Sequence, residues 1–164
     1  MMKNVKYFIG IDISSEFITV SYYSKKEETY ISLGNYNNNP DGYLLLIKDF
    51  KKASPKITNK NSVICMEATG VYGEQLAYYF SGLGFFIAVE NPLKVKRVFE
   101  ISQHKTDEVD SRKIAEYAFR FLDELTKWTP NSEILEEISV LLVQREQITK
   151  QKTSNTNALK ALKK

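Results

Sequence analysis

VKYFIGID, residues 5–12, is an apolar run rich in β-branched and aromatic residues that ends on an acid, Asp12. The same pattern recurs in SVICMEA, residues 62–68, where the acid is Glu67. Runs of this composition predict buried strands. A carboxylate at the edge of a hydrophobic core costs several kcal/mol to desolvate unless it is paired or binds a cation. A divalent metal site is the natural explanation for acids in these positions.

Two further acids lie in HKTDEVDSRKIAEYA, residues 104–118, at the start of a helical pattern. Asp107 and Asp110 are three residues apart, which places both on one helix face. Four carboxylates from three elements suit hard cations such as Mg²⁺ or Mn²⁺. Two such ions would activate a nucleophile and stabilise the leaving oxygen of a phosphodiester. Taken singly, Asp12 could cap a turn, Glu67 could pair with a lysine, and the DEVD acids could favour a helix dipole.

The order of elements predicts an α/β fold of the ribonuclease H-like (RuvC-like) class, a mixed sheet flanked by helices. Strands are expected at residues 5–12, 17–24, 28–33, 62–68 and 85–90, and helices at 43–53, 69–84, 91–102 and 107–125. In that fold the first strand is central and the fourth is its parallel neighbour, so Asp12 and Glu67 would lie side by side. GNYNNNPDG (34–42) is expected to be a plain surface loop, with Asp41 available to cap the next helix.

The composition favours a globular protein without a membrane segment. The chain has 164 residues, of which 43% are apolar, and its longest apolar stretches are far shorter than the ~20 residues of a membrane span. We therefore expect a cytoplasmic protein. Cys65 lies inside an apolar strand, where a buried hydrophobe is the expected role. The formal net charge is +3, and no acid follows Glu146, so the C-terminal end suits a polyanion such as nucleic acid.

Three segments resemble one family: GIDIS (10–14), MEATGVYGEQLAYYFSGLGFFIAVENPLKVKRVF (66–99) and KTDEVDSRKIAEYA (105–118). They are similar to the N-terminal, RuvC-like domain of the DEDD-type insertion-sequence transposases, a class of bridge-RNA-guided DNA recombinases. The resemblance implies that Asp12, Glu67, Asp107 and Asp110 are the catalytic, metal-binding quartet. It also implies DNA as substrate, a structured guide RNA as partner, and a serine nucleophile from a C-terminal transposase domain. Because the sequence stops at Lys164, we expect it to be a fragment that does not complete strand exchange alone.

The sequence predicts a RuvC-like domain of residues 1–127, followed by one long helix at residues 131–164. Alternating steps of four and three residues form a heptad seam, which predicts packing against a second copy in a homodimer or higher oligomer. The seam is Ile134, Ile138, Leu141, Arg145, Ile148, Lys152, Asn155, Leu159 and Leu162. Arg145 and Lys152 are expected either to pair across the seam or to contact nucleic acid. Lys105 and Thr106 are expected to contact nucleic acid beside the quartet, although capping of the helix that follows is the favoured role for Thr106.

Two other hypotheses about the function of the chain remain open from the sequence. A nucleotide-binding domain of the actin and sugar-kinase type shares the topology and the G-I-D strand. It needs a second such half with its own phosphate loop, and the sequence contains neither. The other reading is a non-catalytic RNA- or DNA-binding and dimerisation module that has the ribonuclease H-like fold without its activity.

Overall fold

The computed structural model describes residues 4–54, 56–68, 70–99, 106–130 and 133–162. The chain divides into two compact units, Met1–Trp128 and Thr129–Lys164. Among the described residues, the first unit contains a five-stranded sheet with four α-helices, and the second contains one helix, α5 (Glu133–Leu162). Lys105 lies outside the described residues.

One mixed sheet forms the centre of the first unit. Its strand order is β3-β2-β1-β4-β5. The strands are β1 (Tyr7–Ile13), β2 (Phe17–Ser24), β3 (Thr29–Asn37), β4 (Ser62–Glu67) and β5 (Phe86–Glu90). β1 pairs antiparallel with β2 and parallel with β4, and β4 pairs parallel with β5. The central first strand and its parallel fourth neighbour are confirmed, and the fold is ribonuclease H-like.

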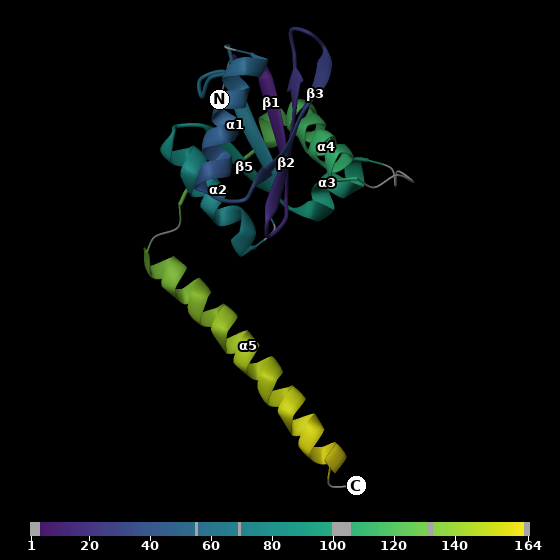
Figure 1. Ribbon diagram of the computed structural model, residues 1–164, viewed down its shortest axis with the longest axis vertical. Coiled ribbons are helices and arrows are strands. Elements are labelled where there is room, and N and C mark those ends of the chain that lie inside the picture. The colour runs from purple at the N-terminus through teal and green to yellow at the C-terminus, as the bar shows by residue number, and fades with distance from the viewer. Residues whose placement is uncertain (1–3, 55, 69, 100–105, 131–132, 163–164) are drawn as a thin grey trace. The chain divides into compact units, whose positions relative to one another are not determined.

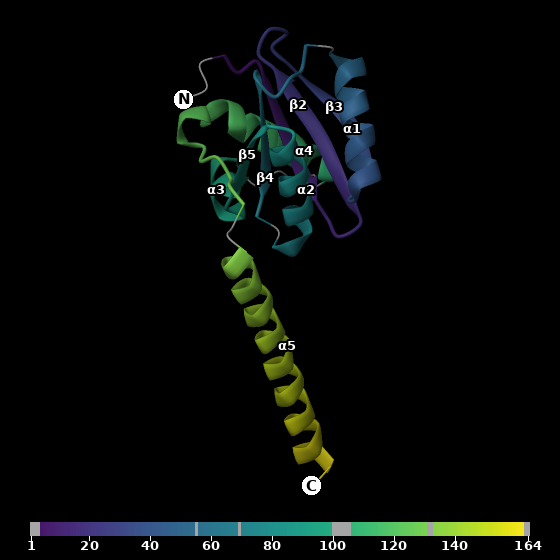
Figure 2. The same ribbon diagram turned by 90° about the vertical axis from the view of Figure 1, so that its left-hand side faces the viewer.

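Helices cover both faces of the sheet, with α1 and α2 on one side and α3 and α4 on the other (Figure 1). They are α1 (Pro40–Ala53), α2 (Val71–Gly82), α3 (Pro92–Val98) and α4 (Asp107–Arg120), with a short 3₁₀ turn at Leu122–Glu124. Figure 2 shows α1 beside β3. Because each helix must bury an apolar stripe, the two faces of the sheet carry separate hydrophobic clusters.

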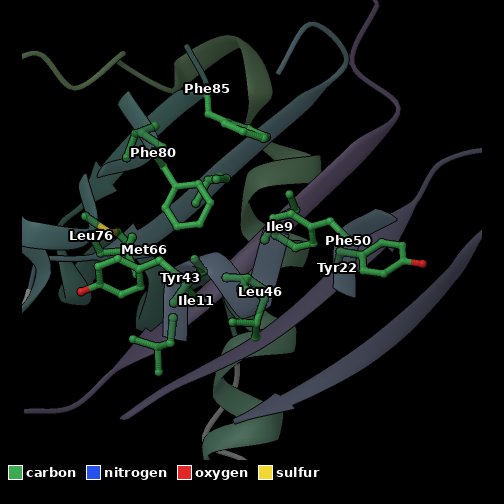
Figure 3. Packing of buried hydrophobic residues seen from close by; sticks show 14 of the residues in the cluster. Ile9, Ile11, Tyr22, Tyr43, Leu46, Phe50, Met66, Leu76, Phe80 and Phe85 are labelled. Atoms are coloured by element: carbon green, nitrogen blue, oxygen red, sulfur yellow. The ribbon is translucent and has the colours of Figure 1, made fainter. Parts of the chain in front are cut away.

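Alternation along the strands decides which cluster each side chain joins. On β1, Ile9 and Ile11 point to the α1/α2 side, where they meet Leu46 and Phe80 (Figure 3). Phe8 points to the opposite side and packs in the cluster beneath α4. Cys65 on β4 is fully buried in that second cluster, which confirms its predicted role as a buried hydrophobe. This burial raises the pKa of its thiol far above the usual value. Asp12, two residues further along β1 than Gly10, follows the α4-facing alternation.

The segment 34–42 differs from the predicted loop. β3 continues to Asn37, through Gly34 with φ +93°, opposite a register shift between Val20 and Ser21 on β2. An irregularity of this kind lets a strand bend without ending. The continuation of β3 was not predicted because its asparagine-rich composition is typical of a loop. α1 then begins at Pro40, and the capping side chain is Asn39, which accepts from the Gly42 N–H at 2.9 Å. The expectation of Asp41 as the cap was wrong.

In the second unit, α5 is a single continuous helix. Apolar side chains exposed along it include Leu135, Ile138, Val140, Leu141, Leu142, Val143, Ile148 and Leu159. Among the described helices, none combines the length and apolar character that crossing a bilayer requires.

Candidate functional site

Asp12 and Glu67 lie at the carboxyl ends of two adjacent strands, Asp12 as the penultimate residue of β1 and Glu67 as the last residue of β4. The parallel register pairs Ile11 with Met66, and the two acids are the next residues along β1 and β4. Both are half-buried. Neighbouring strands lie about 4.8 Å apart, so their backbones run side by side at the carboxyl end of the sheet. As predicted, the pairing of β1 with β4 places these two acids on neighbouring strands.

Both acids follow the alternation that faces α4. On β4, Val63 and Cys65 belong to the cluster beneath α4, and Glu67 is two residues further on. On β1, Phe8 belongs to the same cluster, and Asp12 is four residues further on. Because side chains of a strand alternate between faces, Asp12 and Glu67 are on the α4 side of the sheet.

α4 lies directly on β1 at Gly10. A Cβ at Gly10 would be only 2.1 Å from the backbone oxygen of Ser111 and 2.3 Å from the backbone nitrogen of Ala115. The Ser111 hydroxyl is also 2.8 Å from the hydroxyl of Ser21, the residue paired with Gly10 across β1 and β2. The absence of a side chain at Gly10 therefore allows helix and sheet to touch backbone to backbone.

The direction of α4 follows from a second contact. Phe119, near its C-terminal end, packs against Phe8 with ring centroids 5.2 Å apart, while Ser111 lies over Gly10. The helix therefore runs opposite to β1, and its N-terminal turn extends toward the strand end that carries Asp12. Thr106 caps this turn by accepting from the Val109 N–H at 3.3 Å, which confirms the predicted capping role.

Asp107 and Asp110 occupy that first turn. They precede the sheet-facing residues Ser111 and Ile114 by four positions each, so they continue the stripe of α4 that faces the sheet. Asp107 is exposed, and Asp110 is half-buried with the Lys113 ammonium 3.4 Å from its carboxylate. The fold thus brings the helix end with both acids to the edge that carries Asp12 and Glu67.

The arrangement supplies the right donors for a hard cation without assembling them into a coordination sphere. Among the residues that the structure describes, no three Asp, Glu, His or Cys side chains lie close enough to hold one ion. The chemistry of the donors nevertheless fits Mg²⁺ or Mn²⁺, because the acids at this edge offer only carboxylate oxygens. The quartet as a metal site therefore stays a prediction.

Glu90 is a fifth acid at this edge that the sequence reasoning missed. It ends β5 and pairs in register with Glu67. It is buried, with 6% of its surface exposed, and the ammonium of the exposed Lys94 lies 3.5 Å from its carboxylate. The signal was the one used for the other strands, since Glu90 closes the apolar run FFIAVE.

The remaining predicted contacts to nucleic acid are untested. Arg145 and Lys152 are exposed on α5, within the second unit. Each also contributes a backbone oxygen to a threonine hydroxyl one turn later, Thr149 at 2.7 Å and Thr156 at 2.8 Å. Their charged side chains point to no partner that the described structure contains.

Comparisons with known proteins give the class and then the family. The fold is ribonuclease H-like, and residues 9–162 match a family model described as a transposase, the DEDD transposases of the IS110 type. The chain therefore belongs to this family of insertion-sequence transposases, which confirms the family that the motifs indicated.

Two solved structures are similar to it. T. thermophilus RuvC in complex with a Holliday junction substrate is 11% identical, with 74% of this chain and 99% of that chain covered and a TM-score of 0.44. The fowlpox virus Holliday junction resolvase is 13% identical, with 72% and 98% covered and a TM-score of 0.41. A comparison with curated protein sequences gave no significant match.

Proposed function

We propose that this chain is the catalytic domain of a DNA transposase and recombinase that acts on phosphodiesters with Mg²⁺ or Mn²⁺ held by Asp12, Glu67, Asp107 and Asp110. The observation that supports this most is the register of β1 and β4, which makes Asp12 and Glu67 neighbours on the face covered by α4. Membership in the transposase family supports DNA as the substrate.

The residues of this chain would divide the work as follows. Asp12 and Glu67 are fixed by the hydrogen-bonded strands, so they provide the rigid half of the site. Asp107 and Asp110 sit on the first helical turn, where the helix dipole favours nearby negative charge. A bound divalent ion would supply Lewis-acid activation at the phosphate. Lys113 neutralises Asp110 in this structure and would have to release it for metal binding.

The proposal extends to partners that the family resemblance implies. A structured guide RNA would direct the choice of DNA, and a serine from a C-terminal transposase domain would attack DNA beside the quartet. Thr106, Lys105, Arg145 and Lys152 are the candidate contacts to nucleic acid, and we place the activity in the cytoplasm. Binding to phosphates through these residues should weaken steeply with salt.

Thermal unfolding with increasing Mg²⁺ or Mn²⁺ tests the metal site. Ligand that binds only the folded state raises its stability by about 2.7 kcal/mol at a hundredfold excess over Kd, which is a shift of several degrees. The variants Asp12→Asn, Glu67→Gln and Asp107→Asn should each lose most of this shift. Asp123→Asn is the control, because Asp123 is an exposed acid beyond the opposite end of α4. An equal metal shift in all four variants and the wild type would refute the quartet.

An alternative is a non-catalytic RNA- or DNA-binding and dimerisation module of the same fold. One observation favours it: within the described ranges, no three potential ligand side chains are close enough for a metal. The two proposals differ in the titration above. The binding module would bind nucleic acid equally well with and without EDTA. Its melting temperature would not change when divalent ions are added.

For α5 we propose packing against the same helix of a second copy. The seam residues Ile138, Leu141, Ile148 and Leu159 are exposed by 46–64%. Exposed apolar residues outside the seam, such as Leu142 at 58%, offer more surface than a two-stranded coil buries, which is compatible with a higher oligomer.

Light scattering of the full chain and its variants tests this association. Ile148→Glu should shift the protein to a monomer, whereas Asn157→Glu, placed outside the seam, should not. A wild type that is monomeric at ~100 µM, where even weak dimers are detectable, would refute the association.

A further inference from the structure

Asn38 connects the two chain segments that leave the acid-bearing strands. Its Nδ2 donates to the backbone oxygen of Ser14 at 2.9 Å and to that of Tyr72 at 3.0 Å. Ser14 follows β1, two residues after Asp12. Tyr72 is in the first turn of α2, five residues after Glu67. A single amide group therefore joins the exits of β1 and β4 at the edge of the sheet where both acids lie.

The segment after β1 is a turn closed by hydrogen bonds. The Ser14 N–H donates to the Phe17 oxygen at 2.9 Å, and the Ser14 hydroxyl donates to the same oxygen at 2.8 Å. Asn38 adds a third connection, since its own N–H donates to the Glu16 oxygen at 2.8 Å. Asn38 is therefore bonded to the turn that follows Asp12 at two positions, Ser14 and Glu16.

Asn38 is itself held in place. The Tyr43 hydroxyl donates to its Oδ1 at 2.5 Å, which leaves Nδ2 to serve as the donor toward the two backbone oxygens. Tyr43 is fully buried (Figure 3), and burial raises the pKa of its phenol to about 12, so it remains a donor at neutral pH. The close approach of α1 to β3 restrains the chain further, because a Cβ at Gly42 would lie 2.0 Å from the Asn37 oxygen.

We propose that Asn38 is a positioning residue for the candidate metal site. By setting the separation of the backbone after Asp12 from the backbone after Glu67, it holds the two carboxylates where they can share one cation. Residues outside the ligand set that orient metal ligands typically change metal affinity by about 10–100-fold when mutated. The inference rests on the proposed function, and it assigns Asn38 a role that a plain loop residue would not have.

A matched control exists at the other end of the sheet. Asn59 also bridges two segments through its amide, donating from Nδ2 to the Leu83 oxygen at 2.8 Å. It precedes β4 at the strand's amino end, away from the acids. Asn59→Ala and Asn38→Ala each remove a side-chain amide that bridges to backbone oxygen, so both should lower the melting temperature by a few degrees.

The experiment measures Mn²⁺ affinity by calorimetry and amide hydrogen exchange without metal, in the full chain. Asn38→Ala should weaken Mn²⁺ binding about tenfold or more and speed exchange in residues 14–17 and 71–74. Asn59→Ala should leave Mn²⁺ affinity within about twofold of the wild type. Tyr43→Phe keeps the aromatic ring and removes only the hydroxyl that orients Asn38, so it should give an intermediate loss. If Asn38→Ala does not fold, Tyr43→Phe decides by the same criterion.

Each contrary result has a distinct meaning. A wild type without Mn²⁺ binding overturns the metal site and this inference with it. A wild type that binds Mn²⁺, together with an Asn38→Ala protein of the same affinity, overturns only the role of Asn38. Equal losses of affinity in Asn38→Ala and Asn59→Ala would also overturn it, because the effect would then be general destabilisation.

Discussion

The substitution Gly10→Ala tests how closely α4 rests on the sheet. The added Cβ would lie 2.1 Å from the Ser111 oxygen and 2.3 Å from the Ala115 nitrogen, both of them backbone atoms that cannot rotate away. Ordinary contact begins at 3.4 Å, so the helix backbone would have to retreat by about 1.3 Å, the difference between 3.4 and 2.1 Å. Ser111 would then lose its 2.8 Å hydroxyl contact with Ser21.

Two energies of opposite sign decide the outcome. Overpacking of this kind costs about 1–3 kcal/mol or more. Replacing glycine by alanine also restricts the unfolded chain, which stabilises the protein by about 0.4–1 kcal/mol. The steric term is the larger, so we expect Gly10→Ala to lower the free energy of unfolding by about 1–2 kcal/mol. Because α4 carries Asp107 and Asp110, Mn²⁺ affinity should fall as well.

Urea unfolding followed by circular dichroism measures the first effect, and calorimetry measures the second. Gly82→Ala is the control, since a Cβ at the end of α2 meets no atom within 4 Å. It should be neutral or stabilise by up to about 1 kcal/mol. A Gly10→Ala protein as stable as the Gly82→Ala protein would refute the close seating of α4 on β1.

Three further predictions concern individual groups. Glu90→Gln should raise the melting temperature without metal and weaken Mn²⁺ binding several-fold, because it removes a buried charge beside Glu67. Lys94→Gln should leave the melting temperature nearly unchanged, since Lys94 is 66% exposed and its charge is screened by water; a lower melting temperature in Glu90→Gln would contradict this account. Asn39→Ala should cost about 1 kcal/mol in urea unfolding through loss of the α1 cap, and no loss would mean that Pro40 alone fixes the helix start. Burial raises the phenol pKa of Tyr43 from 10.0 to about 12, so the stability that the neutral phenol contributes is complete below pH 10 and is lost as the pH rises toward 12. The free energy of unfolding should therefore decline between pH 10 and 12 less steeply in Tyr43→Phe than in the wild type, and equal slopes would be contrary evidence.

The sequence predicted the parts of the site that depend on strand and helix patterns. Asp12 and Glu67 could be placed because each ends an apolar run, and the order of elements makes those runs parallel neighbours. Thr106 could be identified as a cap because a hydroxyl residue directly precedes an acidic first turn. Glu90 carried the same signal as Glu67 and could have been found. These features are local, so hydrophobic periodicity was sufficient.

The role of Asn38 could not be predicted in the same way. Its stretch, NYNNNPDG, has the composition of a surface loop. What gives Asn38 its contacts is tertiary: the irregular β3 that continues to Asn37, the approach of α1 at Gly42, and the buried hydroxyl of Tyr43. Sequence patterns predict the burial of a residue more reliably than they predict the hydrogen-bond partners of its side chain.

The electrostatics of the sheet edge support the proposed cation site. Glu67 and Glu90 end β4 and β5, and Asp12 is the penultimate residue of the adjacent β1, on the same face of the sheet. Two unit charges as close together as the strand spacing of about 4.8 Å would repel by roughly 3.5 kcal/mol at an effective dielectric constant of 20. The N-terminus of a helix offsets about 0.3–1 kcal/mol of such charge, so α2 and α4, which both begin at this edge, offset only part of the repulsion. Lys94 and Lys113 supply two further positive charges, but Lys94 is 66% exposed and contributes little. A divalent ion at the proposed site would relieve repulsion between these carboxylates, and the metal titration is expected to detect that relief as thermal stabilisation.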